Sequence, residues 1–252
     1  MSRYDTRASH GLIDFEGLPN TRDLGGLLTA DGRRVRRGLL LRSGTLYFAT
    51  SADCRRLMDE YRLRTVVDLR GEDELAEFPD RMERMPGVRY EHADVLRDAI
   101  AGISQNAEAR ERLEAARTNE DDPALFMETV YPHILLGESG VAGYRRFLRC
   151  VLETADGAAL WHCHVGRDRC GMASMLVEAA LGVPMEAIEE DYLATNLYTD
   201  VPSDERTAAN PRFIRAAVAA LTREFGGVTG YLRGALGLDQ ADLDELRARY
   251  LE

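Results

Sequence analysis

Four short apolar runs, separated by stretches with helical spacing, constrain the fold of this chain more than any other feature. The run at residues 65–69 reads Thr-Val-Val-Asp-Leu. It is β-branched and too short for a helix, so it predicts a buried strand. Residues 39–41, 88–92 and 158–162 predict further strands. Strands that alternate with helices form parallel sheets. The sequence therefore predicts an α/β fold with a mainly parallel central sheet flanked by helices.

Helical spacing recurs between the strands and dominates the C-terminal part of the chain. It predicts helices at residues 51–61, 97–118, 123–136, 143–152, 169–181, 185–196, 211–225, 228–236 and 239–250. The segment 95–137 is long for a connection, so we expect a helical lid insertion, with Phe126, Tyr131 and Ile134 facing the pocket or the sheet. We expect residues 1–252 to form a single domain.

The net charge of −11 argues against general binding to nucleic acid or to anionic membranes, because both need a basic surface. No window is apolar for long enough to span a membrane. Residues 1–10 lack the apolar stretch of a signal peptide. We therefore expect a cytoplasmic protein without stable membrane insertion, while leaderless export stays open. The sequence predicts no oligomeric state.

The four cysteines are too few, in a chain of 252 residues, to indicate a disulfide scaffold. Cys54 and Cys150 lie in helix-like patterns, so we expect both to be buried apolar residues. Cys163 and Cys170 lie in a different context, where a predicted strand runs through a short loop into a helix. That stretch reads His162-Cys163-His164-Val165-Gly166-Arg167-Asp168-Arg169-Cys170-Gly171.

A strand, a tight loop and a helix in this order favour the binding of an anion. Backbone N–H groups of such a loop form a nest for phosphate, and the helix dipole adds positive potential. The same field favours a thiolate at Cys163, with a pKa lowered from about 8.5 to roughly 3.5–7.5. Arg169 can bind two phosphate oxygens with its planar guanidinium, and Gly166 allows a close turn. Residues 164–169 are therefore the candidate phosphate-binding loop.

A zinc site is a second interpretation of the same stretch. The candidate ligands would be His162, Cys163, His164 and Cys170. Zinc ligands usually come as paired short spacings from separate turns, whereas these would crowd one loop beside two arginines. We therefore expect no metal and no other cofactor.

The loop resembles that of the cysteine-x5-arginine phosphatases. More narrowly, the chain is similar to the bacterial tyrosine phosphatase family that includes mycobacterial protein tyrosine phosphatase B and the Listeria lipid phosphatase. The similarity extends from about residue 13 to about residue 251. It includes residues 20–26 (Asn-Thr-Arg-Asp-Leu-Gly-Gly), 41–44 (Leu-Arg-Ser-Gly), 66–70 (Val-Val-Asp-Leu-Arg), 191–196 (Asp-Tyr-Leu-Ala-Thr-Asn) and 231–238.

This resemblance implies a cysteine phosphatase-like fold and specific catalytic roles. Cys163 would be the nucleophile, Arg169 would bind the transferring phosphate, and Asp168 would be the general acid inside the loop. A salt bridge from Asp168 to a nearby arginine is the alternative. We expect His162 to orient the loop, and Arg22 and Asp23 to brace one another and the loop. Asp68, at the end of a strand, is a further supporting residue.

Three departures from the family loop bear on this assignment. Arg167 replaces a lysine that the family links to phosphoinositide recognition. His164 and Val165 replace a small pair. Cys170 replaces a hydroxyl residue, and a thiol is a weaker hydrogen-bond donor to the nucleophilic sulfur.

The sequence thus predicts a phosphomonoester hydrolase that forms a cysteinyl-phosphate, with tyrosine phosphatase activity and possible dual-specificity or phosphoinositide activity. The expected partner is a phosphorylated protein or a small phosphorylated substrate. Two alternatives stay open: a phosphate-binding module with weak catalysis, and a phosphatase of a small soluble metabolite.

Overall fold

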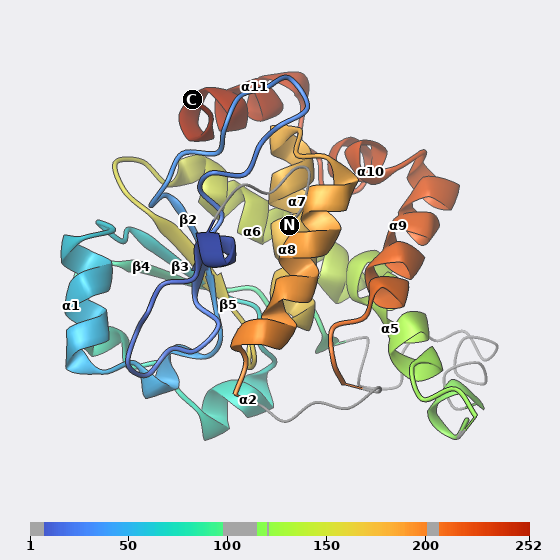
Figure 1. The fold of residues 1–252 in the computed structure, drawn as a ribbon, viewed down its shortest axis with the longest axis horizontal. Helices are drawn as coiled ribbons and strands as arrows, with labels where there is room; N and C mark the ends of the chain where they lie inside the picture. The colour runs from blue at the N-terminus through green and yellow to red at the C-terminus, as the bar shows by residue number, and fades with distance from the viewer. Residues whose placement is uncertain (1–7, 98–114, 120, 201–206) are drawn as a thin grey trace.

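The computed structural model describes residues 8–97, 115–119, 121–200 and 207–252. Within these residues a sheet of five strands has the order β1-β2-β5-β3-β4 (Figure 1). Strands β2, β5, β3 and β4 are parallel to their neighbours, and only the edge strand β1 is antiparallel. The predicted α/β class with a mainly parallel sheet is confirmed. The strands are β1 (Arg22–Asp23), β2 (Leu40–Ser43), β3 (Thr65–Asp68), β4 (Arg89–His92) and β5 (Ala159–His162).

Alternate residues of the central strands enter two different cores. In β3, Val66 packs on one face of the sheet and Val67 on the other. In β5, Leu160 packs in the same core as Val66, whereas Trp161 packs in the same core as Val67. This alternation is what the pleat of a strand imposes. Because both faces are apolar, a slip of one residue in register would still leave apolar groups in both cores, so side-chain shape must fix the register.

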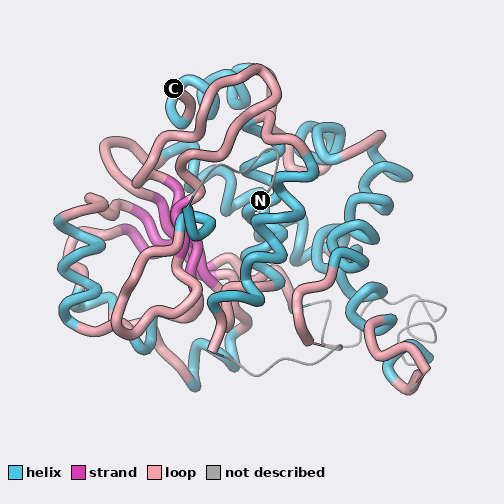
Figure 2. The backbone as a smooth tube through the Cα atoms, viewed as in Figure 1, coloured by secondary structure: helices cyan, strands magenta, loops and turns pink. Residues whose placement is uncertain are grey.

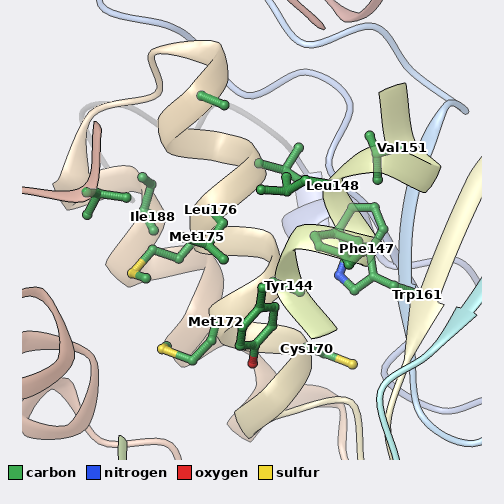
Figure 3. Close-up of a cluster of buried hydrophobic side chains, with 14 of the residues drawn as sticks. Tyr144, Phe147, Leu148, Val151, Trp161, Cys170, Met172, Met175, Leu176 and Ile188 are labelled. Carbon is green, nitrogen blue, oxygen red and sulfur yellow. The ribbon is translucent and has the colours of Figure 1, made fainter. Parts of the chain in front are cut away.

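Helices cover both faces of this sheet. The smaller core lies under α1 (Ser51–Asp59), which contributes Cys54 and Leu57. The larger core lies under α6 (Glu138–Glu153) and α7 (Asp168–Leu181), where Phe147 packs edge-to-face on Trp161 with ring centroids 5.2 Å apart (Figure 3).

The other helices, except the short α2 that follows β3, form a large helical region beside the sheet (Figures 1 and 2). Helix α5 packs most extensively against α9, and α7 packs against α8, α10 and α11. Their bounds are α2 (Glu72–Glu77), α5 (Leu125–Leu136), α8 (Met185–Tyr198), α9 (Pro211–Phe225), α10 (Val228–Gly234) and α11 (Gln240–Tyr250). No helix in the described part of the chain is both long and apolar enough to cross a bilayer.

The sequence did not predict two short elements, β1 and α2. Strand β1 has two residues, too few to show a period, and α2 has no buried residue to give it an apolar stripe. The predicted helix at 97–118 falls largely outside the described residues. The C-terminal part of the 95–137 segment forms α5, which is a core helix: Tyr131 and Ile134 are buried. The lid itself stays a prediction.

The register of the parallel strands brings their carboxyl ends to one edge. Ser43 of β2 and Asp68 of β3 both lie opposite His162 of β5. The loop that follows His162 therefore emerges between the ends of two strands. This is the edge at which α/β folds bind ligands.

Candidate active site

The candidate phosphate-binding loop joins β5 to α7, as the sequence predicts. The strand ends at His162 and the helix begins at Asp168. Gly166 has a φ of +77°, in the left-handed region that glycine adopts readily. A Cβ at this position would lie 2.7 Å from the Ser43 carbonyl oxygen and 2.8 Å from the Gly44 nitrogen. Only glycine fits here, because the loop passes directly over the end of β2.

The carbonyl groups of the loop are held from outside. The Thr45 N–H donates to the His164 carbonyl at 2.9 Å. Asn20 donates through Nδ2 to the carbonyls of Val165 and Gly166, each at 3.2 Å, and Arg42 Nη2 also donates to Gly166 at 2.8 Å. Carbonyls that are bound on the outer side leave the N–H groups of the loop for an anion. This arrangement supports a phosphate nest.

Cys163 lies at the base of this loop and is 2% exposed. Burial opposes ionisation, but a hydrogen bond from the Cys170 thiol and the charge of Arg169 hold the pKa of Cys163 well below its usual range. Burial and the neighbouring Cys163 sulfur raise the pKa of Cys170 well above its usual range. The two opposite pKa directions favour the proton on Cys170 and the negative charge on Cys163.

Arg169 is fixed by a carboxylate that comes from a different part of the chain. Its Nη1 and Nη2 donate to Glu74 of α2 at 2.5 and 2.8 Å, in a two-point contact. The same carboxylate accepts the Gly71 N–H at 3.1 Å, which ties it to the start of its own helix. Burial opposes the charge of Arg169, but the bond to Glu74 raises its pKa. The guanidinium is thus held charged beside the thiolate.

Asp168 has two donors. The Tyr131 hydroxyl donates to its Oδ1 at 2.5 Å, and Arg167 Nε lies 3.1 and 3.2 Å from Oδ1 and Oδ2. The salt bridge to a neighbouring arginine, which the sequence allowed as an alternative role, is therefore present in the structure. Arg167 is 8% exposed, and its Nη1 is buried without a hydrogen-bond partner among the described residues. That atom can donate to a ligand.

His162 is anchored next to Cys163 by two carboxylates. Its Nε2 lies 2.9 Å from Asp80 Oδ2 and 3.7 Å from Asp68 Oδ2, and its Nδ1 lies 3.2 Å from the Cys163 carbonyl oxygen. Burial opposes protonation, but Asp68 and Asp80 raise the pKa of His162 to about 9. Arg70 completes the group, with Nη2 at 2.7 Å from Asp68 and 3.1 Å from Asp80. These contacts agree with the expectation that His162 orients the loop, which stays a prediction.

Arg22 and Asp23 are adjacent in β1, and the contacts of each go to different parts of the chain. Arg22 Nη1 donates to Asp191 Oδ1 at 2.7 Å, and Arg42 Nη1 donates to Asp191 Oδ2 at the same distance. Arg22 thus reaches the loop through Asp191 and Arg42. Asp23 accepts the N–H groups of Gly25 and Gly38, each at 2.8 Å, and so holds the backbone at both ends of the segment 25–38.

An aromatic rim, defined as Tyr47, Phe48, Phe78 and His164, lies beside the loop. The His164 ring is 5.3 Å from Phe78, which is 5.4 Å from Tyr47. Phe48 packs on Tyr47 at 5.0 Å and is 55% exposed, so the rim presents apolar surface to solvent. Because His164 belongs to the loop, this surface is continuous with the phosphate nest.

The geometry does not favour the zinc interpretation. Both ring nitrogens of His162 lie against protein oxygens, so neither is available beside the two thiols. Metal-type ligand atoms do cluster at Asp68, Asp80 and His162, within 4.8 Å of one another. However, the Arg70 guanidinium already contacts both carboxylates and supplies a positive charge there.

Sequence reasoning did not single out Glu74, Asp80 or the rim residues Tyr47, Phe48 and Phe78. Glu74 lies in the first turn of a helix just after the end of a predicted strand, in the acidic run at residues 72–74. That run could have suggested a carboxylate partner for the arginines expected at this edge of the sheet. Asp80 and the rim residues carried no comparable local signal.

Comparison with known proteins adds independent findings. A family model described as the tyrosine phosphatase family matches residues 13–252. A protein of Cupriavidus necator with a provisional name as a tyrosine-protein phosphatase is 33% identical over 258 residues, which are 95% of this chain and 88% of that protein. The triple specificity protein phosphatase PtpB of Mycobacterium tuberculosis is 23% identical and covers 93% of this chain and 97% of its own. The solved structure of P. aeruginosa TpbA covers 86% of this chain and 88% of that chain, at 16% identity and a TM-score of 0.32, which is too low to support an argument.

Proposed function

Because the chain belongs to the tyrosine phosphatase family, we propose that it hydrolyses phosphomonoesters through a cysteinyl-phosphate intermediate on Cys163. One arrangement carries this proposal: the buried Cys163 sulfur lies at the base of a loop whose carbonyls are bound from outside, next to a guanidinium that Glu74 holds in place. Cys163 is the only one of the four cysteines that meets these conditions, since burial raises the pKa of Cys54, Cys150 and Cys170.

In the first step the Cys163 sulfur attacks phosphorus. The S–P bond forms while the bond from phosphorus to the leaving oxygen breaks, and Asp168 transfers a proton to that oxygen. Arg169 and the loop N–H groups bind the phosphoryl oxygens as charge develops on them. In the second step a water molecule attacks phosphorus, its proton goes to Asp168, and Cys163 leaves as the thiolate. The Cys170 thiol donates to the departing sulfur.

The test of this mechanism is Cys163→Ser. A serine hydroxyl is far less ionised than this thiol, while the nest and Arg169 stay in place. We expect loss of turnover with p-nitrophenyl phosphate and retention of vanadate binding. Substantial turnover in the variant would refute the covalent mechanism. The proposed reaction uses no metal ion, so wild-type activity should be unchanged after treatment with EDTA. Loss of activity to the chelator would favour a metal-dependent reaction.

We infer an aryl phosphate as the substrate class, with phosphotyrosine as the protein-borne example. The aromatic rim next to the nest can pack against a phenyl ring, whereas a serine side chain is too short to place its phosphate beside Cys163 and also reach the rim. Dual-specificity and phosphoinositide activity are finer alternatives. The phosphoinositide alternative is motivated by the unpartnered Nη1 of Arg167, which could bind a second phosphate.

A panel of phosphopeptides, phosphoinositides and sugar phosphates would separate these substrates. We expect the highest kcat/KM with phosphotyrosyl peptides. A preference for a sugar phosphate would favour the small-metabolite alternative. Binding of phosphate without turnover of any member, including a simple aryl phosphate, would favour the weakly catalytic binding module.

A further inference from the structure

Tyr131 connects a helix outside the loop to the candidate general acid. It lies in α5, is fully buried, and donates its hydroxyl proton to Asp168 Oδ1 at 2.5 Å. Its oxygen also lies 2.6 Å from the hydroxyl oxygen of Tyr192 in α8. A buried tyrosine hydroxyl normally finds some partner, so burial alone does not explain why the partner is Asp168.

The number of protons fixes the direction of this chain of hydrogen bonds. A tyrosine has one hydroxyl proton, and a carboxylate has none to give. If Tyr131 donates to Asp168, the bond between the two tyrosines must be donated by Tyr192 and accepted by Tyr131. Burial and the nearby Asp168 charge raise the pKa of Tyr131 well above its usual range, so it remains a donor at working pH.

The two oxygens of Asp168 are not equivalent. Oδ1 receives both the Tyr131 hydroxyl at 2.5 Å and Arg167 Nε at 3.1 Å. Oδ2 is contacted by Arg167 Nε alone, at 3.2 Å, among the described residues. Protonation is unfavourable at an oxygen that already accepts two hydrogen bonds. A proton that Asp168 carries to a leaving group therefore belongs on Oδ2.

Aromatic packing holds the Tyr131 side chain in place. Its ring lies 5.2 Å from Phe213 and 6.0 Å from Tyr192, in a tilted and an edge-to-face contact. Helix α5 packs closely against α9, which carries Phe213. Rigid aromatic packing holds a group to within the tolerance that proton transfer needs. Removing the hydroxyl should leave this packing intact.

We propose that Tyr131 is a positioning residue for proton transfer: it holds Asp168 through Oδ1, so that Oδ2 carries the proton to the leaving oxygen. This inference rests on the proposed function, in which Asp168 is the general acid. As the proton moves, the O–H bond at Oδ2 breaks, an O–H bond forms on the leaving group, and Asp168 becomes a carboxylate. The Tyr131 bond strengthens as that negative charge develops.

The test is Tyr131→Phe, measured with aryl phosphates whose leaving groups range from 2,4-dinitrophenol to phenol. We measure kcat/KM because it reports the first chemical step, in which the leaving group departs. We expect kcat/KM for phosphotyrosyl peptide and phenyl phosphate to fall about tenfold to a hundredfold, the factor for a hydrogen bond to a charged group. The kcat/KM for 2,4-dinitrophenyl phosphate, whose leaving group departs without a proton, should change less than about threefold. Vanadate affinity should be unchanged, because Tyr131 does not contact the phosphate.

A matched control is Tyr250→Phe. Tyr250 is also buried, and its hydroxyl donates to the Val151 carbonyl at 2.7 Å. Tyr250→Phe loses one buried hydrogen bond, whereas Tyr131→Phe loses two, because the Tyr192 hydroxyl also loses its acceptor. A small drop in Tm is therefore expected from each variant, and it should be at least as large in Tyr131→Phe. Only Tyr131→Phe should change the dependence of rate on the leaving group. The same change in Tyr250→Phe, or an equal loss across leaving groups in Tyr131→Phe, would overturn the proposal.

A double-mutant cycle separates this inference from the function on which it rests. If Tyr131 acts through Asp168, then Tyr131→Phe should have no further effect in an Asp168→Asn background. If Asp168→Asn slows phenyl phosphate selectively and Tyr131→Phe does not, the inference fails while the acid role stands. If Asp168→Asn slows all substrates equally, the acid role itself fails.

Discussion

Replacing Cys170 with threonine should accelerate the second chemical step. The Cys170 thiol is buried, donates to the thiolate of Cys163, and also lies 3.5 Å from the Ser43 carbonyl oxygen. One weak S–H donor thus has two acceptors in reach. When Cys163 leaves from the phospho-enzyme, the donor to its sulfur stabilises the charge that develops there. A threonine hydroxyl would be the stronger donor.

The size of the effect follows from the strength of this bond. A hydrogen bond to a charged acceptor contributes about 1.5–3 kcal/mol. The thiol is present and supplies part of this, so threonine should recover about 1 to 1.4 kcal/mol, which is about five- to tenfold in rate. Stopped-flow measurement with p-nitrophenyl phosphate should show a burst followed by slow turnover in the wild type. Cys170→Thr should show a smaller burst and a higher kcat.

Cys150→Ser is the matched control for this experiment. Cys150 is also a buried cysteine, and burial raises its pKa to about 11, but it lies in α6 away from the loop. The control should leave the burst and kcat as in the wild type. A burst and kcat that stay unchanged in Cys170→Thr, or that change equally in Cys150→Ser, would refute the leaving-group role.

Three further predictions concern stability, oxidation and substrate choice. The pKa of His162, about 9 in the fold, exceeds the unfolded value of about 6.5. The ion pairs of His162 therefore contribute fully to the free energy of unfolding below about pH 6.5. Up to about 3 kcal/mol of this free energy should be lost as the pH rises through 9, measured by urea titration relative to His162→Gln. Peroxide oxidises the Cys163 thiolate to a sulfenic acid, and the Cys170 thiol can condense with this acid to give a disulfide and water. After peroxide treatment, a thiol reductant should therefore restore less activity in Cys170→Ser than in the wild type, and equal recovery would contradict this. Phe48→Ala should lower kcat/KM for a phosphotyrosyl peptide about threefold or more through lost ring packing, without changing that for a small alkyl phosphate; parallel losses would show that Phe48 does not select the substrate.

Much of the framework could be predicted from the sequence because its signals are local. The strand and helix around Cys163 are contiguous, and the cysteine–arginine spacing lies within a single loop. The alternation of Val66 and Val67 between two cores is likewise a property of neighbouring residues. For such features, periodicity and turn residues carry the information directly.

The partners of the site residues could not be predicted in the same way. Arg169 is bound by Glu74, which lies 95 residues earlier, and Arg22 is bound by Asp191, 169 residues later. Such pairs depend on the order in which the strands assemble, and the chain has many arginines and carboxylates to choose from. The expectation that Arg22 and Asp23 brace one another is the natural choice when only adjacent residues are visible.

An acidic chain that binds an anion needs local positive potential, and the structure indicates where this arises. Glu74 and Asp168 each pair with an arginine of the loop, so neither Arg169 nor Arg167 adds an uncompensated charge. Behind the loop, Arg22 and Arg42 both contact the carboxylate of Asp191.

Two guanidinium groups thus lie beneath the carbonyl side of the loop. Their charge adds there to the helix dipole of α7 and to the N–H groups of the loop. Replacing Asp191 would remove a carboxylate that both arginines contact, whereas replacing Arg22 with methionine would remove one positive charge and keep the contacts of Arg42 with Asp191 and with the Gly166 carbonyl. Loss of vanadate affinity in Arg22→Met, with the protein still folded, is therefore the sharper measure of how much this buried cluster contributes to anion binding.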